Sequence, residues 1–399
     1  MKVLLVGSGG REHALAWKLA QSPSLGELHA APGNSGIAAL GQCHPVRADD
    51  PEALLDLASA LGIDLAVIGP EVPLVSGVAD ELRRGGILVF GPSAGAAAIE
   101  GSKAFAKDVM AAAGVPTATT MAIARPPCVV KADGLAAGKG VIICRTQSEL
   151  DAGLAAVSSF GGSLVIEELL DGPEVSLLAL CDGRDAVPLA VARDYKRAYD
   201  GDEGPNTGGM GTFAPVDGFD DAAVEELMTL VHRPVLAELA RRGTPFIGCL
   251  FAGVMLTDDG PKVLEYNCRF GDPETQSLVP LVDGDLLEAL AAAAVSELTG
   301  VMLRSQGAAV TVVLAAGDYP EAGDTGSPIH GISAAEEAGA LVFHAGTALR
   351  GGQVVTNGGR VLGVVGRGDT LADARAAAYA GVGMISFEGM RYRTDIATY

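Results

Sequence analysis

The chain has 399 residues, 49% of them hydrophobic and 19% charged, so it can bury large cores and is expected to hold two or three domains. Its net charge of −21 argues against nucleic acid as a partner. We find neither a charged-then-apolar leader nor an apolar run of about 18 residues, so neither secretion nor a membrane span is expected.

The cysteines and lysines give two further expectations. The six cysteines show no CxxC spacing and several lie in apolar runs, which predicts reduced, mostly buried thiols and a cytoplasmic protein. An acidic protein that binds an anion must concentrate its cations locally. Five lysines fall within or beside the motif stretches described below: Lys103, Lys107, Lys131, Lys139 and Lys196.

Residues 1–100 alternate short apolar strands with helices. Strands are predicted at Val3–Val6, Leu65–Ile68 and Leu88–Phe90, and a helix at Arg11–Gln21. Such alternation implies an open parallel sheet covered by helices. A glycine turn, Gly7-x-Gly-Gly, stands at the carboxyl end of the first strand, where ligands of open α/β sheets bind.

A nicotinamide-dinucleotide site is one interpretation of this turn. The third glycine of that fingerprint would fall at Glu12, and the second strand runs into Ala31-Pro-Gly-Asn34 without a closing acidic residue. The backbone amides at the helix start can still receive a phosphate. A purely structural turn is the other alternative.

Two cationic stretches follow. Residues 101–114 predict a helix with Lys103 and Lys107 on one face, and Lys107 is expected to be solvated. A short strand then ends in Lys131 and a loop with glycines at 134, 138 and 140, before a second strand at Val141–Cys144. Glycines let a backbone approach phosphates closely. Since three residues separate the first two glycines, the loop is no Walker A motif, and a glycine-rich hairpin is the alternative.

The middle of the chain carries polar side chains on short elements. A helix is predicted at residues 148–158, and then a strand, Leu164–Leu169, in which Glu167 and Glu168 point to opposite faces. Residues 174–190 predict a hairpin that turns at Asp182-Gly183. A helix is predicted over residues 222–242, interrupted at Pro234.

Residues 193–197 and 202–211 lack apolar periodicity and contain many glycines. They predict a long ordered loop, which in a compact domain is usually functional. Its polar side chains suit phosphate, ribose or carboxylate binding: Lys196, Arg197, Asn206 and Thr207.

The stretch Pro261–Gln276 combines a strand with polar groups. Glu265 and Asn267 are two residues apart, so on a strand they face the same space. A carboxylate beside an amide oxygen suits Mg²⁺, which leaves positions open for water and phosphate oxygens. Arg269 follows, with a fork suited to a carboxylate or phosphate. An edge strand whose polar face meets water is the alternative.

The remaining residues predict a helix at 285–299, a strand at Val310–Leu314, a turn at 357–359 and a final helix near 370–382. No Ser-His-Asp or Cys-His spacing stands out, so a protein nucleophile is not expected.

Taken in order along almost the whole chain, these stretches resemble the glycinamide ribonucleotide synthetase family of ATP-grasp carboxylate–amine ligases. The resemblance implies an α/β fold with three domains. These are an open parallel-sheet, biotin-carboxylase-like domain at 1–101, an ATP-grasp domain at 102–304 with a lid at about 117–178, and a small C-terminal α/β domain at 305–399. The matching segments are Gly7–Ala14, Gly69–Leu74, Glu100–Phe105, Lys131–Gly140, Gly204–Gly211, Glu265–Gln276 and Val355–Arg360.

The family joins glycine to 5-phosphoribosylamine with ATP, through glycyl phosphate, in purine biosynthesis. The resemblance implies Mg²⁺ or Mn²⁺ on Glu265 and Asn267, no nucleic-acid or membrane partner, and a monomer or weak homo-oligomer. Implied catalytic residues are Arg269, Lys131 and Asp194. Implied ATP-binding residues are Lys103, Lys131, Gly138, Lys139, Gly140, Glu167, Glu168, Leu169 and Glu174. Implied substrate-binding residues are Gly9, Gly10, Arg11, Glu12, Asn34, Glu71, Lys196, Asn206, Thr207, Gly208, Gly209 and Asp272.

In such a reaction phosphorylation by ATP turns a poor acyl donor into an acyl phosphate, and the protein positions groups and neutralises charge. The glycine-rich loop is expected to close over the triphosphate. Another ATP-grasp ligase with a different acid or amine is the nearer alternative, and a dehydrogenase the distant one.

This chain departs from the family in two places. The segment before Cys128 is short and contains Pro126-Pro127, and the chain ends at Tyr399, with Ala397 where relatives have glycine.

Overall fold

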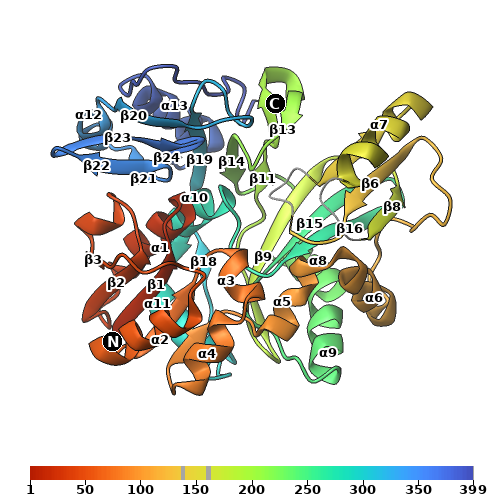
Figure 1. Cartoon of the computed structure of the whole chain (residues 1–399), viewed down its shortest axis with the longest axis horizontal. Coiled ribbons are helices and arrows are strands. Elements are labelled where there is room, and N and C mark those ends of the chain that lie inside the picture. The colour runs from red at the N-terminus through yellow and green to blue at the C-terminus, as the bar shows by residue number, and fades with distance from the viewer. Residues whose placement is uncertain (136–139, 159–162, 399) are drawn as a thin grey trace.

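The computed structural model describes residues 1–135, 140–158 and 163–398. Four sheet-based units make up the molecule (Figure 1). Gly138 and Lys139 lie outside the described residues. Within the described parts of the chain, no helix is long and apolar enough to cross a membrane. All six cysteines are free and five are buried, as predicted.

The first unit is a five-stranded parallel sheet whose central strands, Lys2–Gly7 and Leu65–Ile68, are almost wholly buried. The alternation of strands and helices predicted this architecture. Across the sheet, the strands are β3 (Gln42–Cys43), β2 (Glu27–Pro32), β1 (Lys2–Gly7), β4 (Leu65–Ile68) and β5 (Leu88–Phe90). Its helices are α1 (Gly10–Leu19), η1 (Ile37–Ala39), α2 (Pro51–Leu61), α3 (Glu71–Val75), α4 (Val78–Arg84) and α5 (Ala94–Gly101).

The second unit is a four-stranded antiparallel sheet in the order β10-β9-β15-β16. The predicted hairpin is present, since β9 pairs with β10 on either side of residues 183–185. The strands are β9 (Glu174–Asp182), β10 (Ala186–Pro188), β15 (Ile247–Thr257) and β16 (Gly260–Asn267). Its helices are α6 (Lys103–Ala113), α8 (Asp221–Leu227), η3 (Met228–His232), α9 (Arg233–Arg241) and α11 (Leu286–Ala294). Two further helices, α10 (Glu274–Leu278) and η4 (Val279–Leu281), pack instead between α1 and the C-terminal sheet.

The helix predicted over residues 222–242 is broken one turn earlier than expected. Its middle, Met228–His232, is a π-helix, and Pro234 stands in the first turn of α9. A proline has no amide hydrogen and its ring crowds the carbonyl four residues back, so the turn before it widens.

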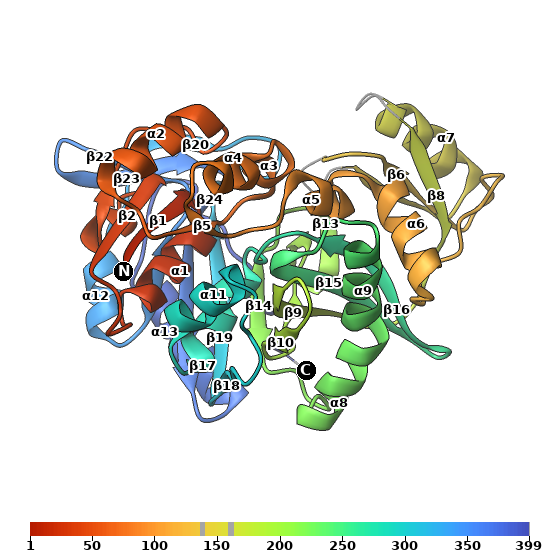
Figure 2. The same cartoon turned by 90° about the horizontal axis from the view of Figure 1, so that it is seen from below.

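The third unit falls within the stretch 117–178 predicted as a lid and keeps that name below; it is a small sheet in the order β7-β6-β8, covered by one helix. Figure 2 shows it projecting from the body next to α6. Its elements are β6 (Cys128–Ala132), β7 (Val141–Cys144), α7 (Gln147–Ser158) and β8 (Leu164–Glu168).

The C-terminal sheet has the order β11-β14-β19-β24-β21, and a smaller sheet, β20-β23-β22, lies beside it. Two of its strands, β11 (Arg193–Asp194) and β14 (Gly211–Ala214), come from the middle of the chain. The other elements are β19 (Ala308–Ala315), β20 (Asp324–Pro328), α12 (Ile332–Glu337), β21 (Leu341–His344), β22 (Thr347–Arg350), β23 (Gln353–Gly358), β24 (Arg360–Gly368) and α13 (Leu371–Val382).

The segment predicted as one long loop is therefore built from strands. Between β11 and β14 lies a hairpin of β12 (Arg197–Tyr199) and β13 (Glu203–Asn206), joined by η2 (Asp200–Asp202). Another short pair, β17 (Val282–Asp283) and β18 (Arg304–Ser305), follows later in the chain. The hairpin strands are close in sequence but carry no apolar alternation, and β14 pairs with β19, about a hundred residues later, so the local pattern gave no sign of these strands.

The first and last units meet at a buried histidine pair. The backbone N–H of His344 donates to His13 Nδ1 at 2.8 Å, and the His13 ring packs edge-on against Phe343 at 5.4 Å between centroids. Burial, and then the nearby His344, lowers the pKa of His13 to about 3, and burial lowers the pKa of His344 to about 4. Both rings are therefore neutral at pH 7.

This pair predicts an acid-sensitive interface. Because both folded pKa values lie below the ordinary 6.5, the unfolded chain binds more protons below that pH, and stability falls from pH 6.5 toward 4. Each histidine contributes a slope of up to about 1.4 kcal/mol per pH unit. His13→Asn, which keeps an acceptor but cannot titrate, should flatten the fall in melting temperature. Equal slopes for the variant and the unmodified protein would contradict the assignment.

Candidate functional site

Strand β16 presents two oxygen donors to one face. Glu265 pairs with Gly253 of β15 and Asn267 with Phe251, without a register shift between them. The side chain between them, Tyr266, points the other way and donates its hydroxyl to the Val231 carbonyl. The predicted shared face of Glu265 and Asn267 is therefore confirmed.

Several cations surround Glu265. Lys196 Nζ lies 3.9 Å from Glu265 Oε1. Burial alone would raise the pKa of Glu265, but Lys196, Lys131, Lys103 and Arg269 together hold it below its usual range. The carboxylate is thus ionised and available to a metal ion.

Glu167 on β8 links two lysines. Its carboxylate lies 2.6 Å from Lys131 Nζ and 2.7 Å from Lys107 Nζ. Lys131 also donates to the Leu264 carbonyl at 3.0 Å, which ties the lid to β16. The two lysines and one carboxylate leave a net positive charge at this junction.

Lys107 is therefore not solvated, and that prediction was wrong. It also donates to Thr117 Oγ1 at 3.0 Å and to the Ala118 carbonyl at 2.5 Å. These acceptors and Glu167 come from other parts of the chain, so the helix pattern could not reveal them.

Glu168 faces away from Glu167, as the strand alternation predicted. It accepts hydrogen bonds from the backbone and hydroxyl of Thr119 at 2.8 and 2.9 Å. Leu169 follows directly at the end of β8, and the Gly140 carbonyl, at the start of β7, accepts from Ala132 N–H at 2.8 Å.

Lys103 begins α6 and reaches the lid. Ser102 caps this helix by accepting from Phe105 N–H, and Lys103 Nζ donates to the Gly134 carbonyl at 3.0 Å. Burial lowers the pKa of Lys103, while Glu265 opposes that shift. Its positive charge therefore lies beside Gly134, just after β6 of the lid.

Arg269 joins the first unit to the end of β16. Its guanidinium lies 3.2 Å from Glu71 on α3 and 3.2 Å from Glu100 on α5. Burial opposes its charge, but Glu100 and Glu71 raise its pKa. Glu100 also accepts from Cys268 N–H at 2.8 Å, which fixes the backbone beside the arginine.

A second acidic group lies beside Lys196. Lys196 donates to Glu174 at the start of β9. Asp194 Oδ1 is buried and has no hydrogen-bond partner within the described residues. Burial, and then Glu274, raises the pKa of Asp194 well above its usual range. Glu274 was not predicted, although it lies in the matching stretch 265–276.

The predicted residues at the start of α1 are engaged with one another. Glu12 accepts from Gly9 N–H at 2.6 Å and from Arg11 Nε at 2.5 Å, and Arg11 also donates to the Phe270 carbonyl at 3.1 Å. Asn34 donates to the Ser8 carbonyl at 2.8 Å. Since Glu12 takes the Gly9 amide that a dinucleotide phosphate would use, this turn does not suit a dinucleotide.

A cavity of about 510 Å³ lies between the first and last units. It includes Gly9, Asn34 and Asp272 from the predicted set, with Arg360 from β24. Arg360 lies 3.4 Å from the Asp272 carboxylate and donates to the carbonyls of Asp272 and Gly208. Arg360 was missed as a site residue, although the matching stretch 355–360 ends on it.

Three further predicted glycines and a threonine do not line this cavity but pack closely against other residues of the site. A Cβ at Gly10 would come within 2.7 Å of Gln276, and one at Gly209 within 2.8 Å of Asp194. Gly208 touches the Arg360 guanidinium in the same way. Thr207 donates its hydroxyl to the Lys196 carbonyl at 2.9 Å, so it supports the lysine's backbone.

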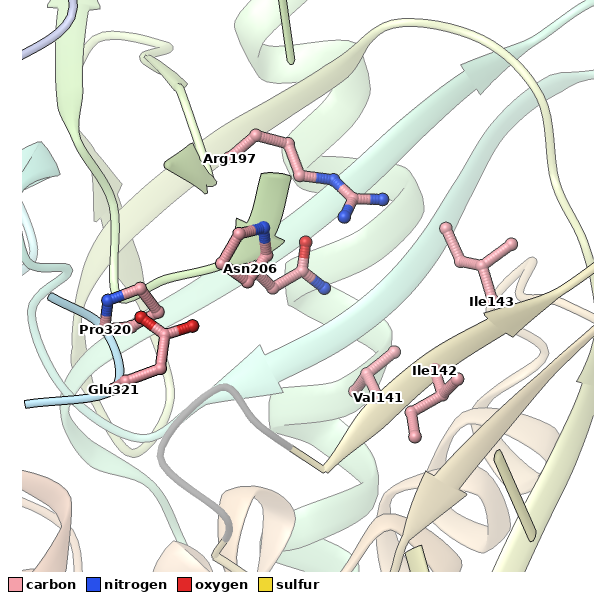
Figure 3. Close-up of a pocket in the computed structure, with 8 residues that line it drawn as sticks. Val141, Ile142, Ile143, Arg197, Asn206, Pro320 and Glu321 are labelled. Carbon is pink, nitrogen blue, oxygen red and sulfur yellow. The ribbon is translucent and has the colours of Figure 1, made fainter. Parts of the chain in front are cut away.

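A second cavity, of about 410 Å³, separates the lid from the β12–β13 hairpin. Figure 3 shows Arg197 and Asn206 on one side of it and Val141, Ile142 and Ile143 of β7 on the other. Asn206 thus lies apart from the cavity that holds Gly9 and Asp272.

Known protein families and relatives match this chain along nearly its whole length. The models of the phosphoribosylglycinamide synthetase N domain, ATP-grasp (A) domain and C domain match residues 1–100, 101–275 and 309–399. Phosphoribosylamine–glycine ligase of Streptomyces coelicolor is 49% identical over 100% of this chain and 99% of its own. The Caulobacter vibrioides ligase is 48% identical over 99% and 97%.

Solved structures agree. Phosphoribosylamine–glycine ligase from Thermotoga maritima superposes with a TM-score of 0.86 and 36% identity over the whole of both chains. A biotin carboxylase domain from Hydrogenobacter thermophilus, in complex with MgADP and bicarbonate, shares the fold at a TM-score of 0.73 and 17% identity, covering 98% of this chain and 91% of its own. Since the family models span most of the chain and the relatives match it end to end, the chain belongs to the phosphoribosylglycinamide synthetase family.

Proposed function

We propose that this ATP-dependent ligase, which joins glycine to 5-phosphoribosylamine, activates glycine as glycyl phosphate at the cationic face of β16. The observation that carries the proposal is the convergence of Lys103, Lys131, Lys196 and Arg269 on Glu265. In a protein with a net charge of −21, such a cluster suits a polyphosphate and a carboxylate.

The reaction runs in two displacements. A carboxylate oxygen of glycine attacks the γ-phosphorus of ATP, the bond to ADP breaks, and glycyl phosphate forms. The amine of phosphoribosylamine then attacks the acyl carbon, phosphate leaves, and the amine loses a proton. Both steps gain most from fixed positive charge that needs no rearrangement as negative charge moves.

Each cation has a proposed task that follows from its position. Arg269 steadies the transferred phosphoryl group, since Glu71 and Glu100 hold it in place. Lys131 and Lys103 neutralise the nucleotide phosphates at the lid. Glu167 positions Lys131 rather than touching the nucleotide, because lysines occupy its carboxylate.

The divalent metal fits Glu265 and Asn267. They offer an ionised carboxylate and an amide oxygen on one face, which leaves the remaining positions of Mg²⁺ or Mn²⁺ to water and phosphate oxygens. Among the described residues there is no cluster of three His, Cys, Asp or Glu side chains that could hold a metal alone. When bound, the ion would neutralise the phosphates.

The remaining ligand contacts are proposed from position and from family resemblance. Backbone groups near Glu168 and Leu169 would bind adenine, and Glu174 the ribose hydroxyls. Asp194, whose Oδ1 has no hydrogen-bond partner in the part of the chain that the structure describes, would bind the amine of phosphoribosylamine or glycine. The 510 Å³ cavity would hold the phosphoribosyl group between Gly9, Asp272 and Arg360.

We further propose domains at 1–101, 102–304 and 305–399. The middle domain contributes β11 and β14 to the sheet of the last domain. Free, mostly buried thiols support a cytoplasmic enzyme, and the acidic charge supports the absence of a nucleic-acid partner. We propose no membrane partner and a monomer or weak homo-oligomer.

Phosphate release with single omissions tests the substrate assignment. Release should require glycine, phosphoribosylamine and ATP–Mg²⁺ together, and the sugar product should carry a glycyl amide. Full release without phosphoribosylamine, or with another amino acid in place of glycine, would refute it.

Variants of three neighbouring residues on β16 distinguish effects on activity from effects on stability. Glu265→Ala and Asn267→Leu should reduce kcat at least 100-fold with little change in melting temperature, because neither side chain packs in the core. Tyr266→Phe, on the opposite face, should keep activity and lose about 1 kcal/mol of stability with its buried hydrogen bond. Near-normal activity of Glu265→Ala at ordinary Mg²⁺ would remove it from the metal site.

Arg360 tests the phosphoribosyl cavity. Arg360→Met removes the one arginine that lines this cavity within the described residues, and should raise KM for phosphoribosylamine about tenfold or more. KM for ATP should change less than twofold. Equal increases in both constants would point to a general loss of structure instead.

A further inference from the structure

The chain's last residues return from α13 to the β12–β13 hairpin and bind it through a buried arginine (Figure 1). The Arg393 side chain is 1% exposed. It pairs with Asp395 at 2.6 Å and with Asp202 at 2.8 Å, and donates to the Arg197 carbonyl at 3.1 Å. A buried guanidinium with this many partners fixes the groups around it.

The same tail also holds Tyr195. The Ala397 N–H donates to the Tyr195 hydroxyl at 3.0 Å, and the Arg393 guanidinium lies 4.8 Å from the centre of the Tyr195 ring. The tail itself is tied to α13, because Arg375 donates to the carbonyls of Thr394 and Ile396 at 2.8 and 2.9 Å.

Lys196 lies between these two points of attachment. The tail holds the side chain of Tyr195 on one side of it and the backbone of Arg197 on the other. Lys196 itself extends to Glu174 and Glu265 in the site. A shift of the hairpin would therefore move this ammonium away from Glu265.

We propose that the C-terminal tail, residues 393–397, positions Lys196 for catalysis, with Arg393 as the positioning residue. This inference rests on the proposed function, in which Lys196 is one of the four cations that converge on Glu265 to receive the polyphosphate, and it adds an element outside the ATP-binding unit. The tail belongs to the last unit, so the fit of that unit against the hairpin sets the charge beside Glu265.

A double-mutant cycle on Arg393 and Lys196 tests the inference. We expect Lys196→Met to lower kcat/KM for ATP at least tenfold and Arg393→Met to lower it about fivefold. In the Lys196→Met background, Arg393→Met should change kcat/KM less than twofold, since its effect passes through the lysine. Arg393→Lys, which keeps the charge without the fork, should recover part of the loss.

Two further variants provide a substitute for Arg393→Met and a control. Tyr195→Phe removes the hydroxyl that accepts from Ala397, and it replaces Arg393→Met in the cycle if that variant does not fold. Its effect on kcat/KM should likewise disappear in the Lys196→Met background. Thr398→Ala, one residue beyond the tail, removes a hydroxyl that donates to the Asp395 carbonyl at 2.6 Å, and should leave kcat/KM unchanged. If Arg393→Met lowers kcat/KM by the same factor with and without Lys196→Met, the inference about the tail is wrong, while the proposed function still stands. Full activity of Lys196→Met would overturn the proposed role of Lys196 as well.

Discussion

The ion set of Arg269, Glu71 and Glu100 is the constraint on which the site depends. One guanidinium at the end of β16 lies between carboxylates from two helices of the first unit, so the strand that carries Glu265 and Asn267 is fixed to the parallel sheet. Burying a charge is costly unless it is paired and hydrogen-bonded, and here two carboxylates and the Phe270 carbonyl supply the partners. Loss of either acid would leave the guanidinium with a single carboxylate partner and free the strand end from one of its two helices.

The other cations of the site are also held by carboxylate or carbonyl partners. Lys131 is held by Glu167 and a carbonyl, Lys103 by a lid carbonyl, and Lys196 by Glu174, so each cation is fixed before a ligand arrives. Fixed charges need little reorganisation during phosphoryl transfer, which is how a site without a protein nucleophile can accelerate it. The residues come from the first unit, the lid and the central sheet, so the catalytic face exists only when these units are assembled.

Sequence reasoning was most successful where a signal is local. The strands Leu65–Ile68 and Leu88–Phe90 and the shared face of Glu265 and Asn267 follow from apolar runs and from the two-residue period of a strand. It failed where the partner is distant. Lys107 is partly buried and paired because Glu167 comes from another element, and β14 joins a sheet whose next strand is about a hundred residues away. Neither the burial of a cation nor a long-range strand pair leaves a trace in spacing.

The central claim is that the cations on β16 and its neighbours steady phosphoryl transfer onto the carboxylate of glycine. Glycine labelled with ¹⁸O in its carboxylate tests it most directly, because the oxygen that attacks phosphorus must leave with the phosphate. Incubation with ATP–Mg²⁺ and phosphoribosylamine should release phosphate carrying one labelled oxygen per turnover, as measured by mass spectrometry. Unlabelled phosphate would mean that another group is phosphorylated, and would contradict the roles of Arg269, Lys131 and Glu265 together.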